Sequence, residues 1–125
     1  MPTGQCVPYV RVKDARASLD YYHRCLGFHE DWERPFDSES PRRIAVSRGS
    51  LHLFLSEAAD DGSIGVCIYC FVHDADRMHA EFERAGALAV TAVRDVPWGR
   101  EFSVRDPDGN QLRFGSPHLD ASIAA

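Results

Sequence analysis

Two cysteines in a C-x-x-C spacing, Cys67 and Cys70, are the first residues whose type and spacing suggest chemistry. Redox and zinc versions of this motif lie at a helix start or in a turn. Here the motif lies inside a run rich in β-branched and aromatic residues, 66–72, without a turn residue. Residues three apart on a strand point to opposite faces, so the two sulfur atoms would not share a metal ion. We therefore predict that both cysteines serve packing.

The alternation of side chains along the predicted strands indicates a second set of side chains that could do chemistry. In the runs 51–55, 101–105 and 111–114, apolar residues alternate with polar or aromatic ones, and alternate residues share a face. The face opposite the leucines collects six such side chains: His52, Phe54, Glu101, Ser103, Gln111 and Arg113. A face of this kind is either solvated, as in many antiparallel sheets, or the lining of a ligand cleft. Parity favours neither alternative.

Other catalytic patterns are weak. The segment 62–65 has neither the spacing nor the lysine of a phosphate-binding loop. The serines, histidines and aspartates follow no nucleophile-elbow pattern. The remaining histidines are expected on solvated helix or loop surfaces: His23, His29, His73, His79 and His118.

The elements that position these residues are repeated. The tetrapeptide V-x-D-A occurs twice, and its aspartates, Asp14 and Asp74, are placed to cap a helix N-terminus. A glycine, Gly27 or Gly86, is placed to end each helix. The apolar residues between them are spaced as one helical face requires: Ala15, Leu19, Tyr22 and Leu26 in the first copy, Ala75, Met78, Phe82 and Ala85 in the second.

Each predicted helix is followed by three predicted strands. They are expected at 30–33, 43–47 and 50–55 in the first copy, and at 88–93, 100–105 and 110–115 in the second. Turns are predicted at Arg48-Gly49 and at 106–110, where Pro, Asp and Gly favour them. The segment 57–65 is the linker. The chain is therefore interpreted as two β-α-β-β-β copies, with chance similarity of two strand–helix units as the alternative.

Length and charge limit the function further. A chain of 125 residues favours one compact domain. No apolar run approaches the ~18–20 residues of a membrane span, and residues 1–12 do not resemble a signal peptide, so we expect a cytoplasmic protein without a membrane partner. The net charge of -5 argues against nucleic acid and for a neutral or cationic ligand.

Several motifs make the chain recognisable. The stretches 7–14, 18–22 and 26–28 resemble the opening of the vicinal-oxygen-chelate superfamily, which includes glyoxalase I, extradiol dioxygenases, fosfomycin-resistance enzymes and bleomycin-resistance proteins. The stretch 97–110, with its W-G-R-E-F sequence, resembles the bleomycin-resistance branch in particular. The resemblance runs from about Val7 to Phe114.

The resemblance implies an α+β fold of paired βαβββ modules that form a cup-shaped mixed sheet with helices on its outer face. The chain would be a single domain, 1–125, with modules at about 5–57 and 66–116. It further implies a homodimer with two clefts between subunits, and an N-terminal strand exchanged after Pro8, where proline's fixed φ suits a hinge.

The resemblance also implies where the superfamily's enzymes hold a divalent metal. Those positions fall at Val7, His52, Ile68 and Arg113. Valine and isoleucine have no donor atom, and arginine is a permanent cation. His52 by itself cannot form a site that needs three or four ligands, so we predict no metal, no cofactor and no enzyme.

The function implied is sequestration of a DNA-damaging glycopeptide drug of the bleomycin type, without chemical modification. One alternative is another planar drug, such as an anthraquinone-fused enediyne or mitomycin. A second is a metal-independent enzyme that uses His52, Glu101 or Arg113. A third is a protein with a different small ligand or a regulatory partner.

The candidate ligand-binding residues combine stacking rings with polar groups: Trp32, Phe36, His52, Phe54, Asp61, Ser63, Trp98, Gly99, Arg100 and Arg113. Trp32 and Phe36 are expected in the loop after the first copy's second strand, with a partly buried surface-loop residue as the alternative for Trp32. Trp98 lies beside Gly99, which leaves room for close approach, although a dimer contact is the alternative. Ser63 is either a hydrogen-bonding residue or an ordinary linker serine. Nearby acids would attract a cationic tail or are simply solvated: Asp31, Glu33, Asp37, Glu39, Asp60 and Asp61.

Overall fold

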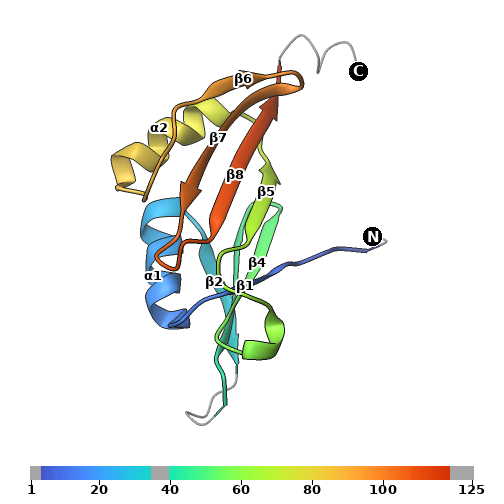
Figure 1. The fold of residues 1–125 in the computed structure, drawn as a ribbon, viewed down its shortest axis with the longest axis vertical. Helices are drawn as coiled ribbons and strands as arrows, with labels where there is room; N and C mark the ends of the chain where they lie inside the picture. Colours follow the sequence, from blue (N-terminus) through green and yellow to red (C-terminus); the bar gives the residue numbers. More distant parts are fainter. Residues whose placement is uncertain (1–3, 35–39, 119–125) are drawn as a thin grey trace. The chain divides into compact units, whose positions relative to one another are not determined.

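The protein consists of two compact units, Met1–Val66 (unit 1) and Cys67–Ala125 (unit 2), in a computed structural model that describes residues 4–34 and 40–118. Each unit is one β-α-β-β-β copy. Within each unit the helix lies on one face of a four-stranded sheet (Figure 1). The predicted α+β class and the repeat are thus confirmed.

Unit 1 forms a mixed sheet in the order β1-β4-β3-β2, in which β1 runs parallel to β4 and the other neighbours are antiparallel. A short 3-10 helix, η1, follows the sheet where a linker is predicted. The elements are β1 (Tyr9–Arg11), α1 (Ala15–Leu26), β2 (His29–Arg34), β3 (Arg43–Arg48), β4 (Leu51–Ser56) and η1 (Ala59–Asp61).

Unit 2 repeats this topology in the order β5-β8-β7-β6, with β5 parallel to β8. Its elements are β5 (Cys67–Phe71), α2 (Ala75–Ala85), β6 (Arg94–Val96), β7 (Gly99–Arg105) and β8 (Gln111–Pro117). None of the helices in the described part of the chain is long and apolar enough to cross a membrane.

Both helices begin and end where the sequence predicts. The Asp14 side chain accepts a hydrogen bond from the Ala17 amide, and Asp74 does the same for Arg77, each at 3.1 Å. These bonds satisfy backbone donors that the first helical turn leaves without partners. Gly27 ends α1 with φ of 76° and Gly86 ends α2 with φ of 81°, a conformation that glycine adopts without steric cost.

The apolar helix faces pack against the sheets, with three exceptions to the predicted stripes. Ala15, Tyr22 and Leu26 of α1 are fully buried, and so are Ala75 and Phe82 of α2. Leu19 and Met78 are only partly buried, and Ala85 is exposed because α2 ends there. In unit 2 the Phe82, Phe102 and Phe114 rings contact one another at centroid distances between 5.1 and 5.8 Å.

The strand predicted at 88–93 is wrong. Leu88 forms only an isolated bridge with Arg105, and the regular strand β6 begins at Arg94. Ala89 has a positive φ of 50°, which interrupts an extended backbone. The segment stays attached to β7 through Thr91, whose amide donates to the Ser103 carbonyl at 3.0 Å.

The predicted turn at 106–110 is held by side chains. The Asp106 Oδ1 atom accepts hydrogen bonds from the Asp108 and Asn110 amides, each at 2.9 Å. Asn110 Nδ2 donates to the second Asp106 oxygen at 2.9 Å, and both side chains are buried. Gly109 supplies the left-handed residue with φ of 84°. This turn joins β7 to β8 in unit 2.

The C-x-x-C residues lie on opposite faces of β5, as predicted: Cys67 is exposed and Cys70 is buried. Burial raises the pKa of the Cys70 thiol to about 11, so roughly one molecule in a thousand carries its thiolate at pH 8. We expect iodoacetamide at pH 8 to alkylate Cys67 in the folded protein and to spare Cys70, with peptide mass spectrometry as the measurement. Modification of Cys70 at the rate of Cys67 would contradict this burial, and urea-unfolded protein is the control.

Candidate functional site

Three aromatic rings form a row across the sheet of unit 1, on the face opposite α1. Tyr9 pairs in register with Phe54, Phe54 with Ala45, and Ala45 with Trp32. The Phe54 ring centroid lies 5.3 Å from that of Tyr9 and 5.1 Å from that of Trp32. The small Ala45 side chain lies between Phe54 and Trp32 in register, so their rings meet over it. We call Tyr9, Phe54 and Trp32 the aromatic row.

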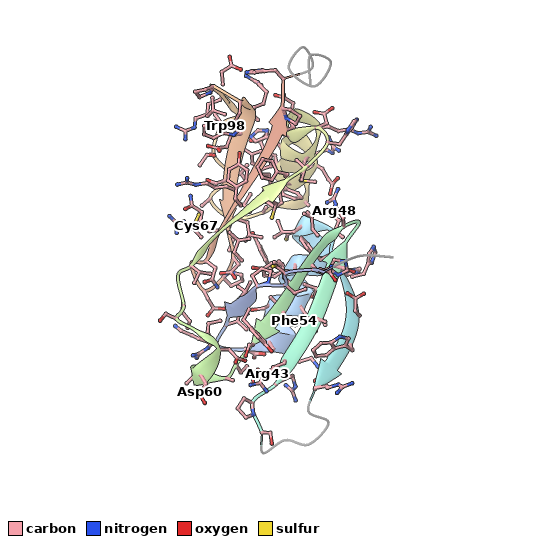
Figure 2. All side chains as sticks on the ribbon, turned by 90° about the vertical axis from the view of Figure 1, so that its right-hand side faces the viewer. Arg43, Arg48, Phe54, Asp60, Cys67 and Trp98 are labelled. Carbon is pink, nitrogen blue, oxygen red and sulfur yellow. The ribbon has the colours of Figure 1, made fainter. Side chains whose placement is uncertain are left out.

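This row is accessible. Tyr9 is 42% exposed and Trp32 is 38% exposed, both large values for aromatic residues on a strand. Figure 2 shows Phe54 on the β4 strand in the view onto this unit's open face. Trp32 lies on β2, within the strand predicted at 30–33 and beside a bulge at Glu30/Trp32, so the expectation that it lies in the loop after that strand is wrong. The bulge shifts the register so that Trp32 shares the face of Ala45 and Phe54.

Basic residues border the aromatic row. Arg34 lies over the Trp32 ring, with its guanidinium carbon 5.5 Å from the ring centroid, a cation–π contact. Arg43 donates to Asp61 at 2.7 Å, and the Ser56 hydroxyl donates to the same oxygen at 2.6 Å. Arg43 and Ser56 together hold the pKa of Asp61 below its usual value. Asp61 therefore lies beside the row as an ion-paired group.

The other predicted residues of unit 1 are less engaged. His52 is half-buried on the face of Phe54 and pairs in register with Ser47. Ser63 is exposed after η1. Glu33 lies on the opposite face, where Arg16 and Arg42 each contact it at 2.6 Å, and does not join the aromatic row. Three predicted residues lie outside the described residues: Phe36, Asp37 and Glu39.

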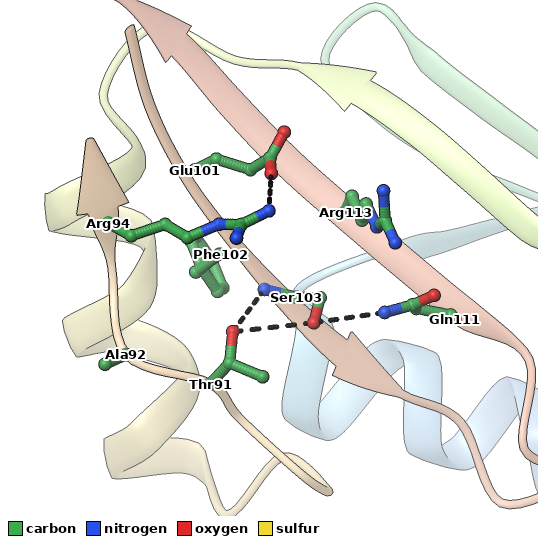
Figure 3. A pocket seen from close by; sticks show the side chains of 8 residues that line it. All are labelled: Thr91, Ala92, Arg94, Glu101, Phe102, Ser103, Gln111 and Arg113. Carbon is green, nitrogen blue, oxygen red and sulfur yellow. Dashed lines mark hydrogen bonds and ion pairs between the residues drawn. The ribbon is translucent and has the colours of Figure 1, made fainter. Parts of the chain in front are cut away.

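Unit 2 carries a polar hollow on the open face of its own sheet (Figure 3). Its volume is about 250 Å³, and it brings together four of the side chains that strand parity singled out: Glu101, Ser103, Gln111 and Arg113. Thr91, Ala92, Arg94 and Phe102 complete its lining. Two hydrogen bonds link the polar residues on one side of the hollow. Gln111 Nε2 donates to Ser103 Oγ at 3.3 Å, and the Ser103 backbone amide donates to Thr91 Oγ1 at 2.9 Å.

Glu101 is the acid of this hollow, and it is 4% exposed. Arg94 donates to its carboxylate at 3.1 Å, and the Tyr69 hydroxyl donates a second hydrogen bond. The Tyr69 hydroxyl in turn accepts a hydrogen bond from Trp98 Nε1 at 3.1 Å. Tyr69 reaches Glu101 across Gly115, where any β-carbon would overlap the Tyr69 ring. Glycine at position 115 is therefore required for this network.

The pKa of Glu101 is a measurable consequence of the network. Burial raises this pKa, but the Tyr69 hydroxyl and the Arg94 guanidinium outweigh burial and lower it overall. A lowered folded-state pKa means that ionised Glu101 stabilises the fold at pH values above its unfolded pKa. That contribution is lost as the pH falls through the folded pKa.

We expect Tyr69→Phe to raise the pKa of Glu101, because the variant removes the hydroxyl donor and keeps the buried ring. Carbon-detected NMR titration of the glutamate carboxyl groups measures this shift, and acid unfolding of the variant should begin at higher pH. Tyr9→Phe, an equivalent change in unit 1, is the matched control. An unchanged Glu101 titration in Tyr69→Phe would show that the hydroxyl does not stabilise the carboxylate.

Three further predicted residues lie in or near β7. Trp98 is 53% exposed and binds Tyr69 through its indole nitrogen. Gly99 is buried, and the space of its missing side chain is filled by the Ser116 carbonyl of β8, so its role is in strand packing. Arg100 points to the helix side of the sheet and is ion-paired with Asp76 and Asp95, which raise its pKa. Arg100 therefore lies on the face opposite Glu101 and Ser103, which are its neighbours in strand parity.

Equivalent sheet positions in the two units carry different chemistry. The in-register row is Tyr9, Phe54 and Ala45 in unit 1, and Tyr69, Arg113 and Ser103 in unit 2. Aromatic contact in the first unit is thus replaced by charge and hydrogen bonding in the second. The candidate residues chosen from the sequence did not include Tyr9 or Tyr69. The two tyrosines nevertheless occupy equivalent positions in the repeat, each two residues before the last residue of its strand.

The residues at the superfamily's metal positions do not fit a divalent metal. Val7 has no donor atom, and Arg113 repels cations. Ile68, predicted at the third metal position, pairs with the buried Leu112 and lies on the helix side of its sheet. The predicted third position is therefore one residue away from a side chain on the face opposite the helix. Among the described residues, no group of three or more His, Cys, Asp or Glu side chains is arranged to hold a metal ion.

Comparisons with known proteins agree with this fold. Residues 2–120 match the family described as glyoxalase superfamily protein. One similar solved structure is the bleomycin-binding protein of Streptomyces verticillus in complex with copper(II)-bleomycin, which is 29% identical in sequence. The match covers 94% of this chain and 99% of the other chain, with a TM-score of 0.71. TnmS3, an antibiotic-binding protein from Streptomyces sp. CB03234, shares the fold at 24% identity and the same coverages, with a TM-score of 0.75. An uncharacterized Mycobacterium bovis protein is 24% identical over 93% of this chain and 85% of its own length. The chain therefore belongs to the glyoxalase superfamily, and the bleomycin-resistance branch that its motifs resemble is represented among the solved structures that it matches.

Proposed function

We propose that this protein binds a planar, DNA-damaging drug of the bleomycin type and holds it without changing it chemically. The aromatic row of unit 1 is the observation that carries the proposal. Its Tyr9 and Trp32 rings remain exposed, and the sheet backbone fixes their spacing. A flat heteroaromatic group can stack on such rings, and each aromatic pair adds about 0.5–1.5 kcal/mol beyond the burial of surface.

The bleomycin-binding protein of Streptomyces verticillus supports this proposal, because it is 29% identical over nearly the whole of both chains.

The charged groups beside the aromatic row bear on the choice of drug. Arg34 lies over Trp32, and Arg43 neutralises Asp61. A surface with arginines beside its rings favours a neutral or weakly charged polycycle over a strongly cationic tail. An anthraquinone-fused enediyne or mitomycin therefore stays an alternative to bleomycin itself.

The state of the polar groups supports binding without chemistry. Glu101 is the buried acid of unit 2, but its lowered pKa makes it a weak base at neutral pH. Arg94 and Tyr69 already occupy its carboxylate. A metal-independent reaction would need a base that is free to accept a proton, so we propose a non-catalytic role.

Calorimetric titration of chelator-treated protein with metal-free bleomycin, and in parallel with an anthraquinone-fused enediyne, tests the proposal. Saturable binding of one ligand per subunit is expected, and mass spectrometry of the recovered ligand should show an unchanged mass. A changed ligand mass would establish an enzyme. Absence of binding to both drugs would refute drug sequestration of this class.

We also propose that the protein acts as a homodimer, as the family resemblance implies. Unit 2 exposes an apolar patch of Phe71, Trp98 and Pro117, and Phe71 is 72% exposed. Exposed apolar patches often mark interaction surfaces. We expect a dimer in sedimentation velocity and a weaker dimer in Phe71→Ser; a wild-type monomer at all concentrations would refute the proposal.

A further inference from the structure

The polar hollow of unit 2 has an excess of positive charge. Arg94 and Arg113 both line it, whereas Glu101 is its only acid among the described residues. Arg94 forms the ion pair with Glu101 at 3.1 Å. One carboxylate thus faces two guanidinium groups, and the hollow keeps a net positive charge.

Arg113 carries the guanidinium of the hollow that forms no ion pair with Glu101. It lies on β8, opposite Ser103 on one side and Tyr69 on the other. No hydrogen bond or ion pair within the described chain satisfies it, although it lies near enough to Tyr69 and Glu101 to influence both. Figure 3 shows its side chain on the same side of the sheet as Glu101, Ser103 and Gln111.

Uncharged polar groups adjoin this guanidinium. The Gln111 side chain lies in the hollow and forms one long bond of 3.3 Å to Ser103 Oγ. The Ser103 and Thr91 hydroxyl oxygens lie 3.4 Å apart. Guanidinium, amide and hydroxyl groups together form a set of donors that favours an acceptor oxygen, above all a charged one.

We propose that this hollow binds a small anionic ligand, a carboxylate or a chemically equivalent acid, with Arg113 as the charge partner and Gln111 as a neighbouring donor. This inference goes beyond the proposed drug binding, which rests on the aromatic row of unit 1. The shape agrees with the chemistry, because a hollow of about 250 Å³ accommodates one acidic group and an attached ring but not a whole glycopeptide.

Sodium benzoate and its uncharged analogue benzamide are the probes that test the inference. Each is titrated into ¹⁵N-labelled full-length protein at constant ionic strength, since salt screens such contacts. We expect benzoate to bind with a dissociation constant at least about tenfold lower than that of benzamide. The shifted resonances should be the Ser103 backbone amide and the Gln111 side-chain amide.

Arg113→Gln removes the charge and keeps a hydrogen-bonding side chain. We expect this variant to lose the preference for benzoate and to leave benzamide binding unchanged. Arg77→Gln, the same change of charge at an exposed position of α2, is the matched control and should keep the preference. Arg113→Lys should restore part of it, because an ammonium supplies the charge without the planar fork.

Three results would overturn the inference: no saturable shift with benzoate, equal affinity for benzoate and benzamide, or unchanged benzoate affinity in Arg113→Gln. Drug sequestration fails separately, because it is tested by bleomycin or the enediyne. A protein that binds the drug but does not distinguish benzoate from benzamide would refute this inference and leave the proposed function intact.

Discussion

Replacing Trp32 by Ala is expected to weaken drug binding by about 30-fold, a loss of about 2 kcal/mol, in a protein that remains folded. Trp32 forms one end of the aromatic row, with its ring 5.1 Å from Phe54 and 38% exposed. Its removal costs the stacked ligand ring a large contact surface but disturbs little of the buried core. Calorimetric titration with metal-free bleomycin, or with the drug found to bind, measures the change.

Trp32→Phe is the matched control for this prediction. Phenylalanine keeps an aromatic ring on the same strand position, so most of the affinity should return. Urea unfolding of both variants must resemble that of the wild type for the comparison to stand. Equal affinities of Trp32→Ala and the wild type would remove the aromatic row from the binding site.

Replacing Gly99 by Ala is expected to lower the free energy of unfolding by about 3 kcal/mol. A β-carbon at Gly99 would overlap the carbonyl group of Ser116 and approach the backbone of Pro117. These are backbone atoms of β8, so no side-chain rotation relieves the overlap, and the β7–β8 pairing has to open at this end. Urea denaturation with linear extrapolation measures the loss.

Gly4→Ala is the control for Gly99→Ala, because a β-carbon at Gly4 meets no atom within 4 Å and its φ is not positive. We expect it to change the stability by less than about 0.5 kcal/mol. A Gly99→Ala protein as stable as Gly4→Ala would show that β7 and β8 are not held as closely as the structure has them. It would also restore Gly99 as a residue whose open space serves a ligand.

Local patterns in the sequence were sufficient wherever neighbours along the chain decide the structure. Asp14 and Asp74 cap their helices as predicted, since a cap needs only the amides two to three residues later. The turn at Asp106–Asn110 likewise closes through its own side chains. Strand parity correctly brought Glu101, Ser103, Gln111 and Arg113 to one face of unit 2.

The sequence-based predictions were wrong where a backbone irregularity or a strand distant in the sequence decides the local structure. Trp32 lies on the strand predicted at 30–33 rather than in the loop after it. The bulge beside it, for which the sequence has no reliable local signal, places its ring on the face of Phe54. The left-handed Ala89 breaks the strand predicted at 88–93.

The sequence by itself thus determined the repeat, the helix boundaries, the alternating strand faces and the membership in the superfamily. Only the tertiary structure decided which polar groups are already satisfied and which remain available to a ligand. Asp61 and Glu101 are paired with arginines, and Tyr69 spans Gly115 to reach Glu101. Such pairings depend on the register between strands, because a hydrogen bond or ion pair requires two groups within about 3–4 Å, whichever residues separate them along the chain.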